Sequence, residues 1–219
     1  MRAFVINLAH RSDRLVAFKN EFWSMYFDTE VVSAVDGRHV VPDPKRVNEW
    51  NFRFLHPEKC KRVVACCLSH LGVWEKIVKE FENGKIDNNT PVVVFEDDVT
   101  TLVDKSEFKT VWGDLLIQLE KTPKDFLWLN SPELHPYKFP KGVYSRHVII
   151  KESSSQVYTT EAYMVKPSYA KILVETIQND IGAVDAHMAR VLASTGNNQG
   201  LSFPLFCQRD RNDTDIQIR

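Results

Sequence analysis

No long apolar run and no long run of Lys and Arg occur in this chain of 219 residues. A helix that spans a bilayer needs roughly 18 apolar residues in succession, so the sequence predicts no transmembrane segment. The 28 basic and 29 acidic residues give a formal charge of −1, which argues against nucleic-acid binding through a basic face. The first residues, MRAFVINLAHRSDR, do not fit a signal peptide, because charges follow the short apolar run at once.

Cysteine is scarce, and the four thiols fit neither a disulfide framework nor a zinc site. Cys66 and Cys67 are adjacent, whereas Cys60 and Cys207 stand apart. Two adjacent cysteines cannot easily share a tetrahedral ion, and no C-x-x-C spacing occurs. We therefore predict no structural zinc at Cys66 and Cys67, and a buried thiol pair beside a helix instead. Free thiols predict a cytoplasmic protein and leave peripheral membrane association open.

Several motifs of nucleotide-binding proteins and hydrolases are also missing. G-x-x-x-x-G-K and G-x-G-x-x-G do not occur, which excludes P-loop and Rossmann dinucleotide sites. No G-x-S-x-G elbow exists to support a serine hydrolase built on Ser69 and His70. The composition is that of a globular protein, with 43% hydrophobic and 26% charged residues. The length suits one α/β domain over residues 1–219.

Strand-like and helix-like segments alternate along the chain. Short apolar or β-branched runs predict strands at 3–8, 30–35, 91–95, 126–129, 143–150 and 156–165. Apolar residues at spacings of three and four predict helices at 12–25, 68–81, 107–120, 167–177 and 184–193. Residues 38–64 show no clear period and are expected to be irregular. The alternation predicts a mixed, mostly parallel sheet with helices on both faces.

Three polar clusters follow predicted strands, at residues 7–14, 36–37 and 96–98. In an open α/β sheet, ligands bind beyond the carboxyl ends of the strands, so we expect one site there. Alternate residues of an extended chain point the same way, so Glu96 and Asp98 can face one ion. Carboxylates suit Mg²⁺ or Mn²⁺, which can bridge a diphosphate. The alternative is a polar strand end in water.

Other polar residues have both a binding and a structural interpretation. Arg11 and Arg14 suit phosphates, or they only begin a solvated helix. Asp36 could accept from a ribose hydroxyl, or it only forms a turn with Gly37. Asp185, near a helix start, could be a general base or a capping residue. The residues alone leave these alternatives open.

Taken in order, these motifs resemble glycosyltransferase family 25, which contains lipooligosaccharide galactosyltransferases and the collagen galactosyltransferase domain. The matching stretches are VINLAHRSDR at 5–14, AVDG at 34–37, ACCLSHLGVWEKIV at 65–78, VVVFEDDV at 92–99, TTEAYMVKPSYAKIL at 159–173, VDAHM at 184–188 and RNDTDI at 211–216. Two departures stand out: Ala65 replaces the Gly that the family usually has before the Cys of its Ser-His segment, and residues 38–64 match poorly.

The resemblance implies a GT-A fold, a UDP-sugar donor, an Mn²⁺ or Mg²⁺ ion and inversion at the anomeric carbon. It implies that Glu96 and Asp98 hold the metal. The donor would lie against Asn7, Arg11, Arg14, Asp36, Gly37, Ser69 and His70. Asp185 would take the proton from the acceptor hydroxyl of a glycan or glycoprotein, with His187 left open as a metal or acceptor ligand. Galactose is the first expected sugar and glucose the next.

Two further functions share this expected site. A nucleotidyltransferase would use the same metal and nucleotide positions but would release pyrophosphate. A catalytically degenerate member of the family would bind the nucleotide sugar without transfer.

Overall fold

The computed structural model describes residues 1–47, 55–130, 149–152, 159–178, 180–197, 199–201 and 204–209. Parts of the two strands predicted at 143–150 and 156–165 lie outside these residues. The tail RNDTDI at 211–216 lies outside them as well. Among the described residues, no helix is both long and apolar enough to cross a bilayer.

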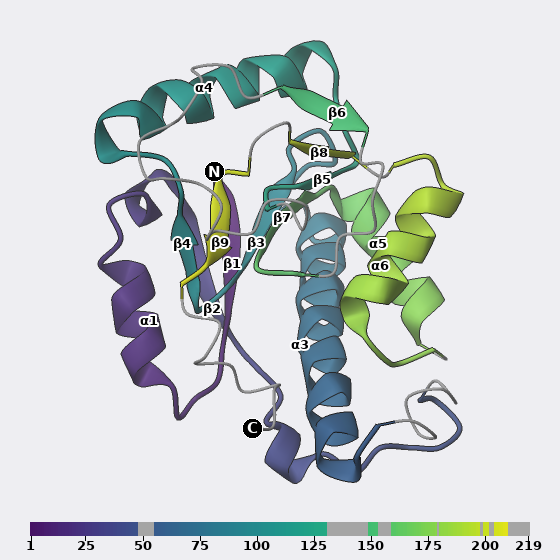
Figure 1. Ribbon diagram of the computed structural model, residues 1–219. Helices are drawn as coiled ribbons and strands as arrows, with labels where there is room; N and C mark the ends of the chain where they lie inside the picture. Colours follow the sequence, from purple (N-terminus) through teal and green to yellow (C-terminus); the bar gives the residue numbers. More distant parts are fainter. Residues whose placement is uncertain are drawn as a thin grey trace.

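A five-stranded sheet in the order β2-β1-β3-β7-β5 forms the centre of the fold (Figure 1). β1 (Arg2–Asn7) pairs in parallel with β2 (Asp28–Ser33) and with β3 (Val92–Glu96). β7 (Ala162–Val165) runs antiparallel to β3 and to β5 (Phe126–Trp128). Four of the five strands therefore point the same way, which confirms the mixed, mostly parallel sheet and is consistent with the GT-A fold.

Helices cover both faces of this sheet, as the alternation predicted. On one side lie α3 (Pro57–Glu82), α5 (Pro167–Ile177) and α6 (Val184–Ser194) (Figure 1). On the other side lie α1 (Ser12–Lys19) and α4 (Lys105–Lys121). Each side has its own hydrophobic core.

The first four residues of β3 are all apolar, because both faces of the strand are covered. Val92 and Val94 belong to the core under α3, whereas Val93 and Phe95 belong to the core under α4. Successive side chains of a strand point to opposite faces, so a strand that is covered on both sides needs no polar alternation.

Short elements complete the fold and join the larger ones. Two antiparallel pairs form, β4 with β9 and β6 with β8. The bounds are Val99–Thr101 for β4, Ile150–Glu152 for β6, Gln199–Leu201 for β8 and Phe206–Gln208 for β9. Two 3-10 turns, η1 and η2, cover Ser24–Tyr26 and Gly37–His39.

The first predicted helix is wrong at its end. α1 stops at Lys19 and η1 follows, so Met25 is 81% exposed and takes no part in the core. The turn instead buries Trp23, whose ring packs against Phe18 and Phe95 at centroid distances of 5.1 and 5.2 Å. Burial of the indole on the sheet therefore outweighs the helical spacing that favoured Met25.

The irregular segment predicted at 38–64 is also wrong in part. α3 begins at Pro57, which occupies the first helical turn, where the missing N–H of proline costs no hydrogen bond. Cys60 and Val64 are buried on this first part of the helix. Their spacing of four continues the apolar stripe that was recognised only from Leu68 onward.

We predict unequal costs for two phenylalanines that share the predicted helix face. Phe18 is 1% exposed, so Phe18→Ala should lower the free energy of unfolding by about 3–5 kcal/mol. Phe22 is only partly buried at the edge of the same core, and Phe22→Ala should cost roughly 1–2 kcal/mol. Urea unfolding of both variants measures the difference. Equal costs would contradict the placement of Phe18 in the core.

Candidate active site

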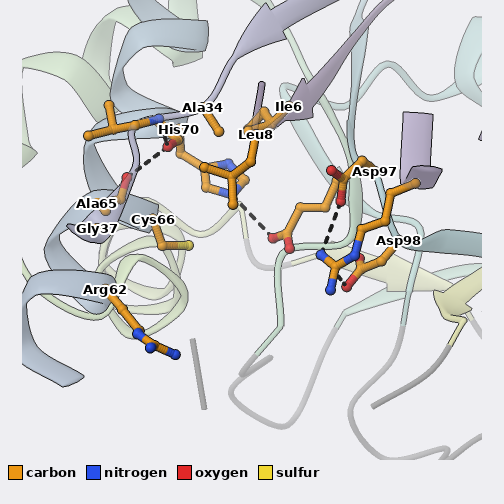
Figure 2. Close-up of a pocket in the computed structure, with 14 residues that line it drawn as sticks. Ile6, Leu8, Ala34, Gly37, Arg62, Ala65, Cys66, His70, Asp97 and Asp98 are labelled. Carbon is orange, nitrogen blue, oxygen red and sulfur yellow. Dashed lines mark hydrogen bonds and ion pairs between the residues drawn. The ribbon is translucent and has the colours of Figure 1, made fainter. Parts of the chain in front are cut away.

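The polar clusters of the sequence meet at one edge of the sheet. Asn7 lies opposite Ser33 and Ile6 opposite Glu96, so β2, β1 and β3 end at the same level. A pocket of about 100 Å³ opens beyond these ends, lined by residues that follow the three strands and by residues of α1 and α3. Figure 2 shows its lining side chains, with His70 facing the acidic turn after β3.

The acidic turn begins where β3 ends, at Glu96. Asp97 and Asp98 form the turn toward β4, so strand alternation does not extend beyond Glu96. Asn7 Nδ2 donates to Asp97 Oδ2 at 2.6 Å, and Arg14 Nη1 lies 3.3 Å from Asp97 Oδ1. Asp97 therefore anchors the turn to β1 and α1, and the turn itself brings Asp98 to the pocket.

Asp98 is a buried carboxyl group in the acidic turn. Its Oδ2 accepts from Gln208 Nε2 at 2.8 Å and lies 3.7 Å from Arg14 Nη1. Its Oδ1 is buried and has no hydrogen-bond partner among the residues that the structure describes. Burial and then the charge of Glu96 raise the pKa of Asp98 to about 7. A cation beside Oδ1 would stabilise the ionised form.

Two side chains, His70 of α3 and Thr160 just before β7, hydrogen-bond to Glu96, and Tyr163 of β7 in turn contacts His70. Its Oε1 lies 3.3 Å from His70 Nε2 and accepts from Thr160 Oγ1 at 2.5 Å. His70 Nδ1 lies 2.9 Å from Tyr163 Oη, which accepts from Trp74 Nε1 at 2.9 Å. Since Trp74 can only donate, the Tyr163 proton is free for Nδ1, which assigns the His70 proton to Nε2, facing Glu96.

This arrangement keeps Glu96 ionised. Burial acts to raise the pKa of Glu96, but the hydrogen bonds from His70 and Thr160 outweigh it and hold the pKa below its ordinary value. Burial first, and then the negative charge of Glu96, raise the pKa of Asp97 and of Asp98. The pocket thus combines the ionised carboxylate of Glu96 with two neighbouring acids whose pKa is raised.

Ser69 and Gly37 fix the loop after β2 against α3. Ser69 Oγ donates to Ala65 O at 2.7 Å and accepts from Val35 N at 2.9 Å, so its hydroxyl is engaged on the protein side. A Cβ on Gly37 would lie 3.0 Å from Arg62 Cα. Only glycine allows the loop to approach the helix this closely.

Asn7, Arg11 and Asp36 are not among the residues that line the pocket as the described residues form it. Arg11 precedes α1 and pairs with Asp13 at 3.0 Å. Asp36 caps η2 by accepting from Arg38 N at 2.9 Å. The Arg38 guanidinium also binds the Asp36 carboxylate and holds the pKa of Asp36 well below its usual range.

Asp185 is not among the residues that line this pocket. It is the second residue of α6, whose N-cap is Ala183, so Asp185 is not the capping residue. Its Oδ1 accepts from Ala186 N at 2.7 Å. Burial and then the charge of Glu96 raise the pKa of Asp185, which places its carboxyl within electrostatic reach of the site.

His187 has a structural role in the same helix. Its Nε2 lies 3.1 Å from Thr176 Oγ1 of α5, and its Nδ1 lies 3.4 Å from Asp180 Oδ2. Both ring nitrogens are therefore engaged with the protein, and burial lowers the pKa of His187.

Sequence reasoning missed Arg62 and Cys66, which line the pocket from α3. Arg62, Cys66 and His70 recur at every fourth position of the helix and share one face. This spacing is in the sequence, but Arg62 fell in the segment that was expected to be irregular. The expected buried thiol pair is confirmed for Cys67, which lies in the core, whereas Cys66 is partly buried, packs against that core and also lines the pocket. Neighbouring helix positions point about 100° apart.

A second buried carboxyl group, also missed, lies behind the acidic turn. Glu161 is 7% exposed and accepts from Asn130 Nδ2, and its carbonyl oxygen accepts from Glu96 N at 2.9 Å. Burial and then the charge of Glu96 raise the pKa of Glu161 to about 7. The sequence could have indicated it as a single acidic residue directly before the apolar strand β7.

Glu161 should make the stability of the metal-free chain depend on pH. Its folded pKa of about 7 lies above the ordinary 4.5, so the folded state binds more protons than the unfolded state between these values. The stabilisation is complete below 4.5 and is lost as pH rises through about 7. Glu161→Gln should therefore gain roughly 3 kcal/mol over the wild type between pH 4.5 and pH 8.

Urea unfolding in the presence of a chelator measures this difference. Glu120→Gln, at an exposed position of α4, is the matched control and should follow the wild type at each pH. A constant offset between Glu161→Gln and the wild type across this range would contradict the buried acid.

Comparisons with known proteins point to one family. Residues 1–188 match the model of "Glycosyltransferase family 25 (LPS biosynthesis protein)". The chain is 30% identical over 183 residues to "Procollagen lysyl hydroxylase and glycosyltransferase" of Acanthamoeba polyphaga mimivirus, covering 78% of this chain and 19% of that protein. It is 26% identical over 183 residues to "Procollagen galactosyltransferase 1-A" of Xenopus laevis, covering 78% of this chain and 27% of that protein.

A third relative carries a different description. The chain is 31% identical over 144 residues to "Inactive glycosyltransferase 25 family member 3" of Mus musculus, covering 61% of this chain and 22% of that protein. The chain thus spans about a fifth to a quarter of the length of these curated relatives.

Proposed function

This chain belongs to glycosyltransferase family 25, and on that premise we propose that it transfers a hexose from a UDP-sugar to a hydroxyl of a glycan or glycoprotein. Galactose is the first candidate, because three matched relatives are named procollagen galactosyltransferases, and glucose is the next. The observation that carries the proposal is the pocket beyond β1, β2 and β3, where a buried oxygen of Asp98 faces no partner among the described residues.

The acidic turn supports a hard divalent cation. Glu96 and Asp98 both line the pocket, and their carboxylate oxygens are the donors that Mn²⁺ and Mg²⁺ prefer. A cation would give the buried Asp98 Oδ1 a partner, and its positive charge would lower the raised pKa of Asp98. When bound, the ion would offset the negative charge that develops on the diphosphate leaving group.

Other residues in and behind the pocket would bind and orient the donor. Arg14 and Arg62 both line the pocket, and guanidinium groups suit phosphate oxygens. Asn7 and Arg14 hold Asp97, which keeps the turn in place for the two metal-binding carboxylates. Gly37 and Ser69 hold the loop after β2, on which the nucleotide would rest. The pocket of about 100 Å³ accommodates only part of a nucleotide sugar, and we assign it to the diphosphate.

Asp185 would supply the base for a single in-line displacement with inversion. An acceptor hydroxyl becomes a good nucleophile when a carboxylate accepts its proton. A pKa raised by burial makes Asp185 a better proton acceptor than an ordinary surface aspartate. Its position outside the lining would leave the pocket itself to the donor diphosphate.

Two other functions remain as alternatives, and a nucleotide-sugar assay separates them. A thermal-shift screen of UDP-galactose and UDP-glucose with Mn²⁺ should raise the melting temperature if the folded state binds the donor. A glycosyltransferase releases UDP, whereas a nucleotidyltransferase would release pyrophosphate. Binding without any release of UDP would indicate a degenerate member, as the name of the mouse relative implies for that protein. No shift with any UDP-sugar would overturn the proposal.

A further inference from the structure

We propose that Cys66 Sγ, His70 Nε2 and the Glu96 carboxylate form a second cation site, suited to Zn²⁺. One ligand atom from each of these residues lies within 4.8 Å of the others. Cys66 and His70 are four residues apart on one face of α3, and Glu96 ends β3 opposite them. The donor set of sulfur, nitrogen and oxygen is typical of zinc and differs from the oxygen ligands of Mn²⁺ or Mg²⁺.

The spacing of His70 Nε2 and Glu96 Oε1 already fits two ligands of a tetrahedral ion. His70 Nε2 and Glu96 Oε1 are 3.3 Å apart. Zinc bonds to nitrogen and oxygen measure 2.0–2.2 Å, so two such ligands at tetrahedral angles stand roughly 3.3–3.5 Å from each other. An ion could therefore replace the hydrogen bond between these atoms without moving α3 away from β3.

The surroundings of His70 resemble those of a metal ligand. The ring is 1% exposed, and Nδ1, the nitrogen that would not bind the ion, lies 2.9 Å from Tyr163 Oη. Trp74 Nε1 donates to the same oxygen and fixes its position. A metal-binding histidine donates the N–H of its second ring nitrogen, so the neutral ring that binds Zn²⁺ through Nε2 would carry its proton on Nδ1 and donate it to Tyr163 Oη, in place of the Nε2–H tautomer of the metal-free site.

Cys66 completes the triad from the adjacent turn of the helix. Figure 2 shows its sulfur pointing into the pocket from the His70 side. Thiolate and carboxylate together would neutralise the charge of Zn²⁺. The pocket leaves room for a fourth ligand, such as water or an oxygen of a bound molecule. Cys67, at the next position, lies in the core and cannot take this role. The proposed site therefore does not use the adjacent cysteine pair that the sequence argues against, but it does replace the expectation that Cys66 binds no zinc.

Glu96 belongs both to this triad and to the carboxylate pair that it forms with Asp98. We expect its carboxylate to bind one of the two ions at a time. Zn²⁺ would then compete with Mn²⁺ or Mg²⁺. This consequence rests on the proposed function, whereas binding of Zn²⁺ to the triad does not.

Zinc binding can be measured without any nucleotide. Metal-free protein is titrated with Zn²⁺ in competition with a chromophoric chelator, and we expect about one equivalent to bind. Cys66→Ala should weaken this binding by more than about 10-fold, since even outer-shell changes cost 10–100-fold. With Co²⁺ as a probe, the wild type should show thiolate-to-cobalt charge-transfer absorption, and Cys66→Ala should lose it.

Cys67→Ala is the matched control, and Cys207→Ala is a second one at a position on β9. Circular dichroism confirms that each variant is folded before titration. Both controls should keep the affinity and the cobalt absorption of the wild type. The site is wrong if the wild type binds no Zn²⁺, if Cys66→Ala binds as tightly as the wild type, or if the folded controls lose binding equally.

The competitive consequence has its own readout. Zn²⁺ should suppress UDP binding that depends on Mn²⁺ in the wild type, and Cys66→Ala should resist this suppression. Tight Zn²⁺ binding with no UDP binding under any condition would support the triad and count against the proposed function alone.

Discussion

Turnover of Asp185→Asn should fall by about 10²–10⁴-fold, the usual scale for losing a general base. Asparagine keeps the shape of the side chain and its hydrogen bond to Ala186 N but cannot accept a proton. Affinity for UDP in the presence of metal should stay within a few-fold of the wild type. Single-turnover kinetics and calorimetry with UDP measure the two quantities separately.

The pH profile gives a second measurement of the same role. Burial and the charge of Glu96 raise the pKa of Asp185, so the wild-type rate should fall with decreasing pH through a pKa above the ordinary aspartate value of 3.8. Asp185→Asn should lose this acid limb. If Asp185→Asn instead loses UDP affinity, the residue belongs to the donor side, and if turnover survives, the base lies elsewhere.

Asp98→Ala should abolish most metal-dependent binding of UDP, with a loss of at least about 100-fold in affinity. The change removes both the buried Oδ1 and the acceptor of the Gln208 hydrogen bond. Calorimetry with UDP and Mn²⁺ measures the loss, and the binding that remains should no longer respond to a chelator.

Matched variants distinguish loss of a ligand from loss of the fold. Glu120→Ala, at an exposed position of α4, should bind as the wild type does. Removing Asp98 also removes a buried acid of raised pKa, so Asp98→Ala should unfold no more easily than the wild type near neutral pH in chelator. Unchanged UDP binding by Asp98→Ala would refute the assignment of Asp98 to the metal.

The order of the chain predicted more of this site than any single residue did. The run PVVVF predicts β3, and the acidic triplet after it lies in the pocket as expected. Strand ends in a parallel sheet share one edge, so the clusters after β1, β2 and β3 had to meet. The local pattern is sufficient to predict these strands and the edge at which they end, because it depends only on the period of the apolar residues and on the order of the segments in the chain.

Helix ends and the inner helix face were harder to predict. Met25 satisfies the helical spacing but is exposed, because the chain turns after Lys19 to bury Trp23 against Phe95. Pro57 begins α3 inside a stretch whose mixed composition concealed the period. In both cases packing against the sheet decides where the helix lies, and propensity alone does not show that packing.

The sequence by itself determined the α/β class, the strands around the site and the presence of an acidic turn. Only the tertiary structure decided which polar groups are free to act. Asp97 and Ser69 are engaged with the protein, whereas Asp98 keeps a buried oxygen without a partner among the described residues. Cys66 meets Glu96 across the pocket although 30 positions separate them in the chain. Contacts between distant segments depend on how the elements pack, and pKa values depend on the burial that packing creates.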